Sequence, residues 1–155
     1  MQIQSFDEVF FDGLTQQAKA SERRRAHHNI HQSLDEPCQR LFIAMETDSF
    51  VVPHRHSNPS KPECFIGVRG HIALFIFDDN GTIQETLHIG PDQPILICDI
   101  PPNTWHAVVS MKSGTVFCEV KPGPYQPIDP TDIAPWSPPK DGQQEYIAKL
   151  KSTLT

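Results

Sequence analysis

Three histidines and one glutamate carry the clearest chemical signal in this sequence: His54, His56, Glu63 and His106. Side chains two positions apart on a strand point to the same face, so His54 and His56 can direct two imidazoles into one interior. Glu63 follows in the chain, and His106 comes directly after a turn-forming segment, 101–104. Imidazole is a borderline ligand and carboxylate is a hard one, so this set suits a divalent transition metal. The sequence therefore predicts a metal site with three nitrogen ligands and one oxygen ligand.

Five further residues are candidates for contact with a substrate. Asn29 and His31 share one face of an alternating run, where they either line a pocket or support a metal ligand, unless that face is simply a polar edge strand. Arg40 stands in an apolar run and could bind an anionic substrate group or pair with Glu119. Tyr125 follows the last expected strand and either closes the pocket rim or packs. For a reaction that moves a proton, His31 and Glu119 are the candidate bases.

The residues between about 26 and 120 have the pattern of short strands joined by turns. Apolar runs are separated by turn signals such as Asp79-Asn80-Gly81, and 15 prolines in 155 residues favour turns over long helices. Strands are expected at residues 26–31, 39–46, 49–56, 63–68, 71–77, 82–89, 95–100, 105–111 and 115–121. Helices are expected at 5–20, capped by Ser5, and at 143–154. This order of elements indicates a closed all-β sandwich or barrel.

Length, charge and cysteine usage restrict the class of protein. At 155 residues the chain has room for one ordinary domain, divided here into an N-terminal helical segment at 1–25, a barrel at 26–125 and a proline-rich extension with a helix at 126–155. A formal charge of −6 argues against nucleic acid and anionic membranes as partners. Four cysteines without a C-x-x-C pair, no apolar signal segment and no run of about 20 apolar residues predict a cytoplasmic protein with free thiols.

Two stretches resemble the cupin motifs. Residues 54–70 hold H-x-H, then a glutamate and a glycine, as in the first motif; residues 101–106 (PPNTWH) are similar to the second. The resemblance spans about residues 40–120 and implies a cupin jelly-roll barrel, or double-stranded β-helix, with the predicted metal site in its mouth. The gap before Glu63 is longer than in the usual motif. Asn103 replaces the glycine of the second motif, which is tolerable because asparagine also adopts the left-handed conformation.

A closer resemblance is to the WbuC-like cupin metalloproteins. It rests on five strings in the same order: RRAHHNIH at 24–31, QRL at 39–41, PHRH at 53–56, PPNTWH at 101–106 and EVKPGPY at 119–125. Members of that family are often found with surface-polysaccharide biosynthesis. The resemblance therefore implies a metal-binding cupin near that metabolism.

Three functional classes follow from these observations. The first is an enzyme in which one Fe, Mn, Ni or Zn ion acts as a Lewis acid on a small polar or sugar-derived substrate, with isomerase- or epimerase-like chemistry. The second is an Fe(II)-dependent dioxygenase, and the third is a non-catalytic module that binds metal or sugar. Exposed sheet edges could also pair in a homodimer.

Overall fold

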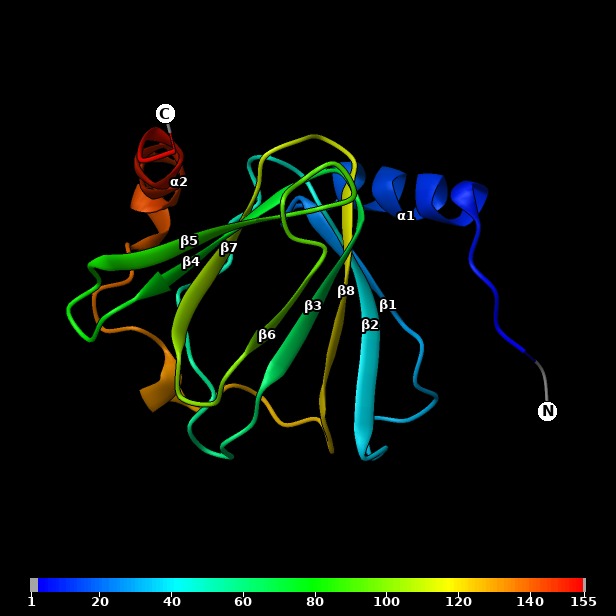
Figure 1. Ribbon diagram of the computed structural model, residues 1–155, viewed down its shortest axis with the longest axis horizontal. Helices are drawn as coiled ribbons and strands as arrows, with labels where there is room; N and C mark the ends of the chain where they lie inside the picture. Colours follow the sequence, from blue (N-terminus) through cyan, green and yellow to red (C-terminus); the bar gives the residue numbers. More distant parts are fainter. Residues whose placement is uncertain (1–2, 155) are drawn as a thin grey trace.

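The chain folds into two antiparallel sheets flanked by two α-helices, in a computed structural model that describes residues 3–154 (Figure 1). The helices are α1 (Glu8–Ala20) and α2 (Gln143–Ser152), and the strands are β1 (Arg25–Asn29), β2 (Cys38–Met45), β3 (Glu63–Arg69), β4 (Ile72–Phe77), β5 (Ile83–Ile89), β6 (Ile97–Ile100), β7 (Trp105–Ser110) and β8 (Thr115–Pro122). The larger sheet has the order β1-β2-β8-β3-β6 and the smaller one the order β5-β4-β7. The predicted all-β class with a helix near each end is confirmed.

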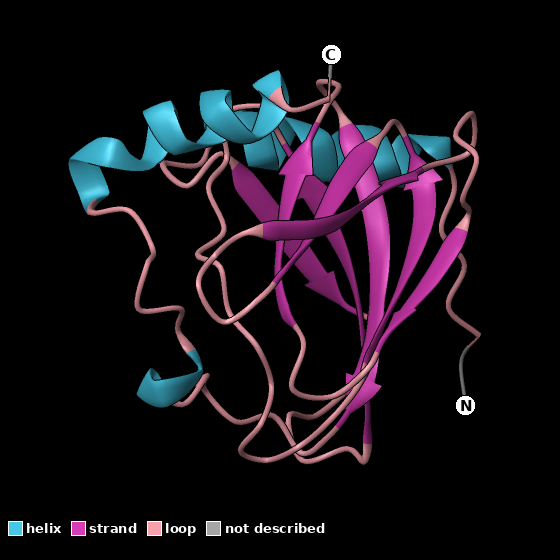
Figure 2. Cartoon of the chain, turned by 60° about the vertical axis from the view of Figure 1, so that its left-hand side comes forward, coloured by secondary structure: helices cyan, strands magenta, loops and turns pink. Residues whose placement is uncertain are grey.

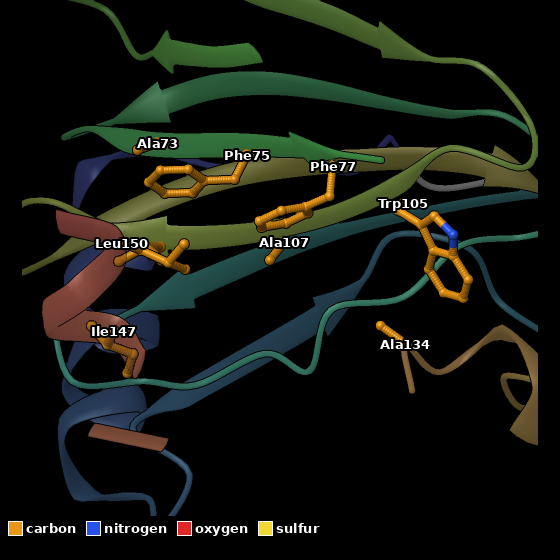
Figure 3. Close-up of a cluster of buried hydrophobic side chains, with 9 residues drawn as sticks. Ala73, Phe75, Phe77, Trp105, Ala107, Ala134, Ile147 and Leu150 are labelled. Carbon is orange, nitrogen blue, oxygen red and sulfur yellow. The ribbon is translucent and has the colours of Figure 1, made fainter. Parts of the chain in front are cut away.

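Three hydrophobic clusters arrange these elements in layers. The central cluster lies between the sheets and includes Leu74. A second packs α1 against the outer face of the larger sheet, where Phe11 meets Phe42 edge-on with ring centroids 5.0 Å apart. The third packs α2 against the outer face of the smaller sheet, with Phe75 and Ile147 among its members (Figure 3). The order of layers is therefore α1, larger sheet, smaller sheet, α2, with the helices on opposite sides of the strands in Figure 1.

This layering explains why β4 is apolar on both faces. Leu74 points to the space between the sheets, whereas Phe75 and Phe77 point to the side covered by α2 and the C-terminal segment. Trp105 on β7 lies on that outer side too, and its Nε1–H donates to Asp79 Oδ1 at 3.0 Å. Because side chains alternate along a strand, His106, the predicted metal ligand that follows Trp105, points to the inner side. Figure 2 shows the strands tapering toward the end of the barrel where many of the loops gather.

Two sequence-based expectations were wrong. The first helix begins at Glu8 and is capped by Asp7, whose Oδ1 accepts from Phe10 N at 2.9 Å, so Ser5 is not the cap. Residues 49–56 do not form a strand; only His54 makes isolated bridges there. Pro53 contributes no N–H to a ladder, which limits regular pairing along this segment. Neither α-helix within residues 3–154 has the length and apolar character needed to cross a membrane.

The cap gives a matched pair of variants. Asp7→Ala removes the acceptor for the Phe10 N–H and should lower the free energy of unfolding by about 1 kcal/mol. Ser5→Ala should change it by less than about 0.5 kcal/mol, because Ser5 lies outside the helix. Urea denaturation followed by circular dichroism measures both values. Equal losses in the two variants would contradict the cap assignment.

Candidate metal centre

The four predicted ligands lie together at one end of the barrel. His106 is the second residue of β7, Glu63 is the first residue of β3, and His54 and His56 lie on the extended segment beside β7. One ligand atom from each of the four lies within 4.8 Å of the others. Glu63 is central to the group, since its Oε1 is 3.1 Å from His56 Nε2 and its Oε2 is 3.1 Å from His106 Nε2.

Burial leaves most of these ligand atoms without a protein partner. Nε2 of His56, Nε2 of His106 and Oε2 of Glu63 are buried, and none has a hydrogen-bond partner within residues 3–154, because the 3.1 Å contacts lack hydrogen-bond geometry. An unsatisfied buried polar group costs about 1–3 kcal/mol. A cation at their centre would satisfy all three atoms at once, so the donor set fits a divalent metal ion.

The ring orientations are those of metal-binding histidines. Nδ1 of His54 lies 2.8 Å from the Val52 carbonyl oxygen, and Nδ1 of His106 lies 2.9 Å from that of Thr104. With Nδ1–H donated to the backbone, the Nε2 lone pair of each ring points to the centre of the cluster. Burial, followed by the neighbouring His106, lowers the pKa of His54 to about 3. His54 is therefore neutral at pH 7, which is the state that binds a metal.

Backbone pairing with β7 positions the His54 segment. His54 N donates to His106 O at 3.0 Å, and His106 N donates to His54 O at 2.9 Å. The turn before β7 adds a third bond, from Asn103 N to His56 O at 3.1 Å. Asn103 has a φ of 60°, the left-handed conformation expected of a residue that replaces the motif glycine. The long gap before Glu63 is accommodated by a loop at 57–62, at the same end of the barrel as the 101–104 turn.

The C-terminal extension holds the other side of the same segment. Arg55 N donates to Asp132 O, and Ala134 N donates to Pro53 O, each at 2.9 Å. The Asp132 side chain is only 2% exposed and accepts from Ser57 N at 2.8 Å and from Arg55 Nε at 3.2 Å. Sequence reasoning missed Asp132, whose only local signal is the Asp-Pro-Thr-Asp turn. Its contacts link residues about 75 positions apart, which no local pattern encodes.

Arg55, between the two histidines, is itself held in place from two sides. Its guanidinium carbon lies 4.2 Å from the centre of the Trp105 ring, and its Nε pairs with Asp132. The cation–π contact with Trp105 and the ion pair with Asp132 therefore direct the Arg55 side chain outward. This outward anchor favours the inward orientation of His54 and His56 on the opposite face.

A lysine compensates the buried carboxylates. Lys121 Nζ lies 3.2 Å from Glu63 Oε1 and 2.6 Å from Glu119 Oε1. Burial would raise the pKa of Glu63, but the imidazoles of His106 and His56, with Lys121, hold it well below its ordinary value. Burial and then Glu63 raise the pKa of Glu119, against the opposite effect of Lys121. Glu63 is thus ionised at neutral pH, which is the state in which a carboxylate binds a metal.

The two predicted residues near the β1–β2 connection have different surroundings. Asn29 on β1 is exposed and aligns with Leu41 of β2, which aligns with Glu119 of β8. His31 is buried, and its Nδ1 lies 3.0 Å from Arg40 N. Its Nε2 has no hydrogen-bond partner in the described part of the chain. Of the two predicted bases, Glu119 lines the cavity beside the ligands and His31 does not.

Arg40 and Tyr125 lie away from the ligands. Arg40 lies on the outer side of β2, as Phe42 does, whereas Ile43 and Met45 lie on the inner side. The Nη2 atom of Arg40 pairs with Glu36 at 3.0 Å. The alternative pairing of Arg40 with Glu119 is therefore wrong, because Lys121 pairs with Glu119 instead.

Tyr125 is half exposed, and its backbone N donates to Leu34 O at 2.7 Å. Its side chain does not line the cavity beside the ligands. A role for Tyr125 at the pocket rim stays a prediction.

A cavity of about 120 Å³ adjoins the ligands inside the barrel. Its polar lining consists of Arg25, His54, Glu63, His106 and Glu119. Its apolar lining consists of Ile43, Met45, Val51, Phe65, Val108 and Phe117. The candidate site thus joins a group of side chains able to hold a metal ion to a small enclosed space with mostly apolar walls.

Comparison with known proteins supports the fold. The family described as "Domain of unknown function (DUF6016)" matches residues 6–89. No curated protein matches the chain. KdgF from Halomonas sp. is 12% identical with a TM-score of 0.52, over 69% of this chain and 85% of its own. The conserved protein of unknown function SPY1581 from Streptococcus pyogenes is 14% identical with a TM-score of 0.54, over 81% and 92%. The similarity in structure confirms the cupin jelly-roll fold.

The Asp132 contacts predict a pH-dependent stability. Burial would raise the pKa of Asp132, but hydrogen bonds from Ser57, Asn58 and Arg55 together lower it. A carboxylate with a lower pKa in the folded chain stabilises the fold above its unfolded pKa, and this contribution disappears as the pH falls through the folded value.

Asp132→Asn should therefore cost about 2 kcal/mol at pH 7, and the difference from wild type should shrink below about pH 4. Denaturant unfolding across this pH range measures it, with the exposed Asp92→Asn as the control. A loss that is independent of pH would contradict the assigned role of the carboxylate.

Lys121 gives a second prediction. Lys121→Met leaves Glu63 and Glu119 without their shared cation, so the metal-free protein should lose about 3 kcal/mol of stability. A bound divalent ion would then supply the missing positive charge, and Zn(II) should raise the melting temperature more in this variant than in wild type. Differential scanning calorimetry with and without Zn(II) tests this, with Lys149→Met on exposed α2 surface as the control. A smaller rise than in wild type would contradict the charge balance described here.

Proposed function

We propose that this chain, which belongs to the family described as "Domain of unknown function (DUF6016)", is a cupin that binds one divalent transition metal and acts on a small polar molecule. His54, His56, Glu63 and His106 would hold the ion. The observation that carries this proposal is the convergence of three buried, unpartnered ligand atoms on one point beside a cavity. Buried polar atoms are normally paired, so such a group of unpaired atoms indicates a missing ligand.

The bound ion would supply Lewis-acid chemistry, polarising a carbonyl or hydroxyl oxygen of the substrate. The residues around it have separate tasks in this proposal. Lys121 holds the Glu63 carboxylate in place through its 3.2 Å contact. Glu119 lines the cavity and is the group that would accept or return a substrate proton at its carboxylate. Apolar walls formed by side chains such as Phe65 and Phe117 would exclude water from this space.

The volume of the cavity limits the size of the substrate. A cavity of about 150 Å³ is known to hold benzene, so about 120 Å³ suits a molecule of five or six non-hydrogen atoms. A sugar-derived substrate would have to extend out of the cavity. Isomerase- or epimerase-like chemistry fits a site with one acid–base group, and the link to surface-polysaccharide metabolism, the homodimer and the cytoplasmic location stay predictions.

The two alternative functions can be tested on the same metal-loaded protein. A dioxygenase would consume oxygen only in the presence of Fe(II) and a substrate. A non-catalytic module would hold its ion without a position that exchanges with solvent. Either behaviour would replace the Lewis-acid proposal.

Metal content tests the proposal directly. Protein purified without an affinity tag, incubated separately with Fe(II), Mn(II), Ni(II) and Zn(II) and then desalted, should retain about one equivalent of at least one ion. His56→Ala and His106→Ala should each lose it, because each removes one of the four proposed ligands. His71→Ala is the matched control, since His71 pairs with His88 away from the site. Mass spectrometry of the metals gives the stoichiometry, and equal content in all variants would disprove the assignment.

A further inference from the structure

One residue that lines the cavity beside the proposed ligands carries a permanent positive charge, and the function proposed so far does not use it. Arg25 of β1 aligns with Met45 of β2, and directly opposed residues share a face, so both side chains lie on the inner side of the larger sheet. Arg25 lines the cavity together with His54, Glu63 and His106, and it also lines the open surface pocket that contains Phe50. Among the cavity-lining residues that the structure describes, Arg25 is the only one with a permanent positive charge.

This guanidinium lacks an acidic partner. Its Nη1 donates to the Phe50 carbonyl oxygen at 2.6 Å, and no carboxylate within residues 3–154 forms an ion pair with it. Arg24, Arg40, Arg55 and Arg69 each pair with a carboxylate, as Arg24 does with Asp48 at 3.0 Å. A guanidinium has five N–H donors, so most of those of Arg25 remain for another acceptor. Burial, followed by the nearby Arg23, lowers the pKa of Arg25, as expected of an uncompensated cation.

The charges of the cavity favour an anion. Glu63 and Glu119 both contact Lys121, so one cation already offsets part of their charge. A divalent ion at the histidines and the guanidinium of Arg25 would together leave excess positive charge in a space with mostly apolar walls. Electrostatic attraction is strong in such an environment because water does not screen it.

The size of the cavity favours a small carboxylate over a phosphate ester. A phosphate group alone has five non-hydrogen atoms, so a molecule that carries one would exceed a space suited to five or six. A carboxylate has three, which leaves room for a short carbon chain and one more oxygen. Its two oxygens also match the fork of a guanidinium.

We propose that the ligand of this cavity is a small carboxylic acid with a second oxygen on the neighbouring carbon, a 2-hydroxy or 2-oxo acid. Arg25 binds its carboxylate, and the second oxygen reaches toward the group of His54, His56, Glu63 and His106. The inference rests on the proposed metal site and adds the substrate class. Arg25 is the residue that determines specificity for an anion.

Glycolate and glycolamide provide a matched test, because they have the same number of non-hydrogen atoms and differ in charge. Calorimetric titration of the wild-type protein, with and without Mn(II), should show glycolate binding at least tenfold more tightly than glycolamide. Arg25→Met should reduce this preference to less than threefold without changing the metal content. Arg24→Met is the control, since Arg24 pairs with exposed Asp48, and it should retain the full preference. Arg25→Lys keeps the positive charge but lacks the paired N–H groups of the guanidinium, so its preference for glycolate should be intermediate. If Arg25→Met does not fold, Arg25→Lys takes its place in the test.

Each outcome decides one of the two proposals. A wild-type protein that binds metal but does not prefer glycolate overturns the carboxylate inference and leaves the proposed metal site intact. A preference that persists unchanged in the Arg25 variants overturns the role of Arg25. A protein that binds no metal and still prefers glycolate through Arg25 supports the inference and contradicts the proposed metal-dependent function.

Discussion

A buried carboxylate needs compensating positive charge or hydrogen bonds, and Glu63 imposes this requirement on the interior of the barrel. Its side chain is only 3% exposed and contacts two imidazoles and one ammonium group. Two of these contacts lack hydrogen-bond geometry, so the carboxylate is only partly satisfied by the protein. A metal ion at this point would supply the charge that the fold leaves missing.

The alternation of side chains along the strands delivers the groups that surround Glu63. On β7, His106 points inward while Trp105 points to the layer covered by the C-terminal segment. On β8, Phe117 packs between the sheets while Val116 packs toward α1. A shift of one residue in the register of β7 would turn His106 to the outer face, and the same shift in β8 would turn Glu119 and Lys121 away from the interior. The helices on the two outer faces, by burying the apolar residues there, therefore help to maintain the geometry of the site.

Much of this arrangement could be predicted from local sequence. The spacing of His54 and His56, the turn before His106 and the alternating runs give the four residues that the structure brings together and the all-β class. Asn103 was expected to tolerate a left-handed conformation and has a φ of 60°. Such features depend on residues that are close in the chain, which is why short patterns reveal them.

The remaining features depend on long-range contacts. The segment 49–56 has a strand-like sequence but makes only bridges, with β7 on one side and the C-terminal extension on the other. Asp132, Lys121 and Arg25 reach the site or its support through tertiary structure, and their neighbours in sequence do not indicate those roles. Arg40, which did stand out in its apolar run, pairs with Glu36 on the outer face instead. Polar residues that stand out in a sequence can thus be satisfied locally, whereas those that complete a site need not stand out at all.

A crystal structure of the protein loaded with Mn(II), with anomalous diffraction data, would locate the ion. We expect a single strong anomalous peak bound by Nε2 of His54, His56 and His106 and by the Glu63 carboxylate, at distances of about 2.0–2.3 Å. A peak elsewhere in the molecule, or the four side chains in direct contact with one another and no peak between them, would show that these residues do not form a metal site.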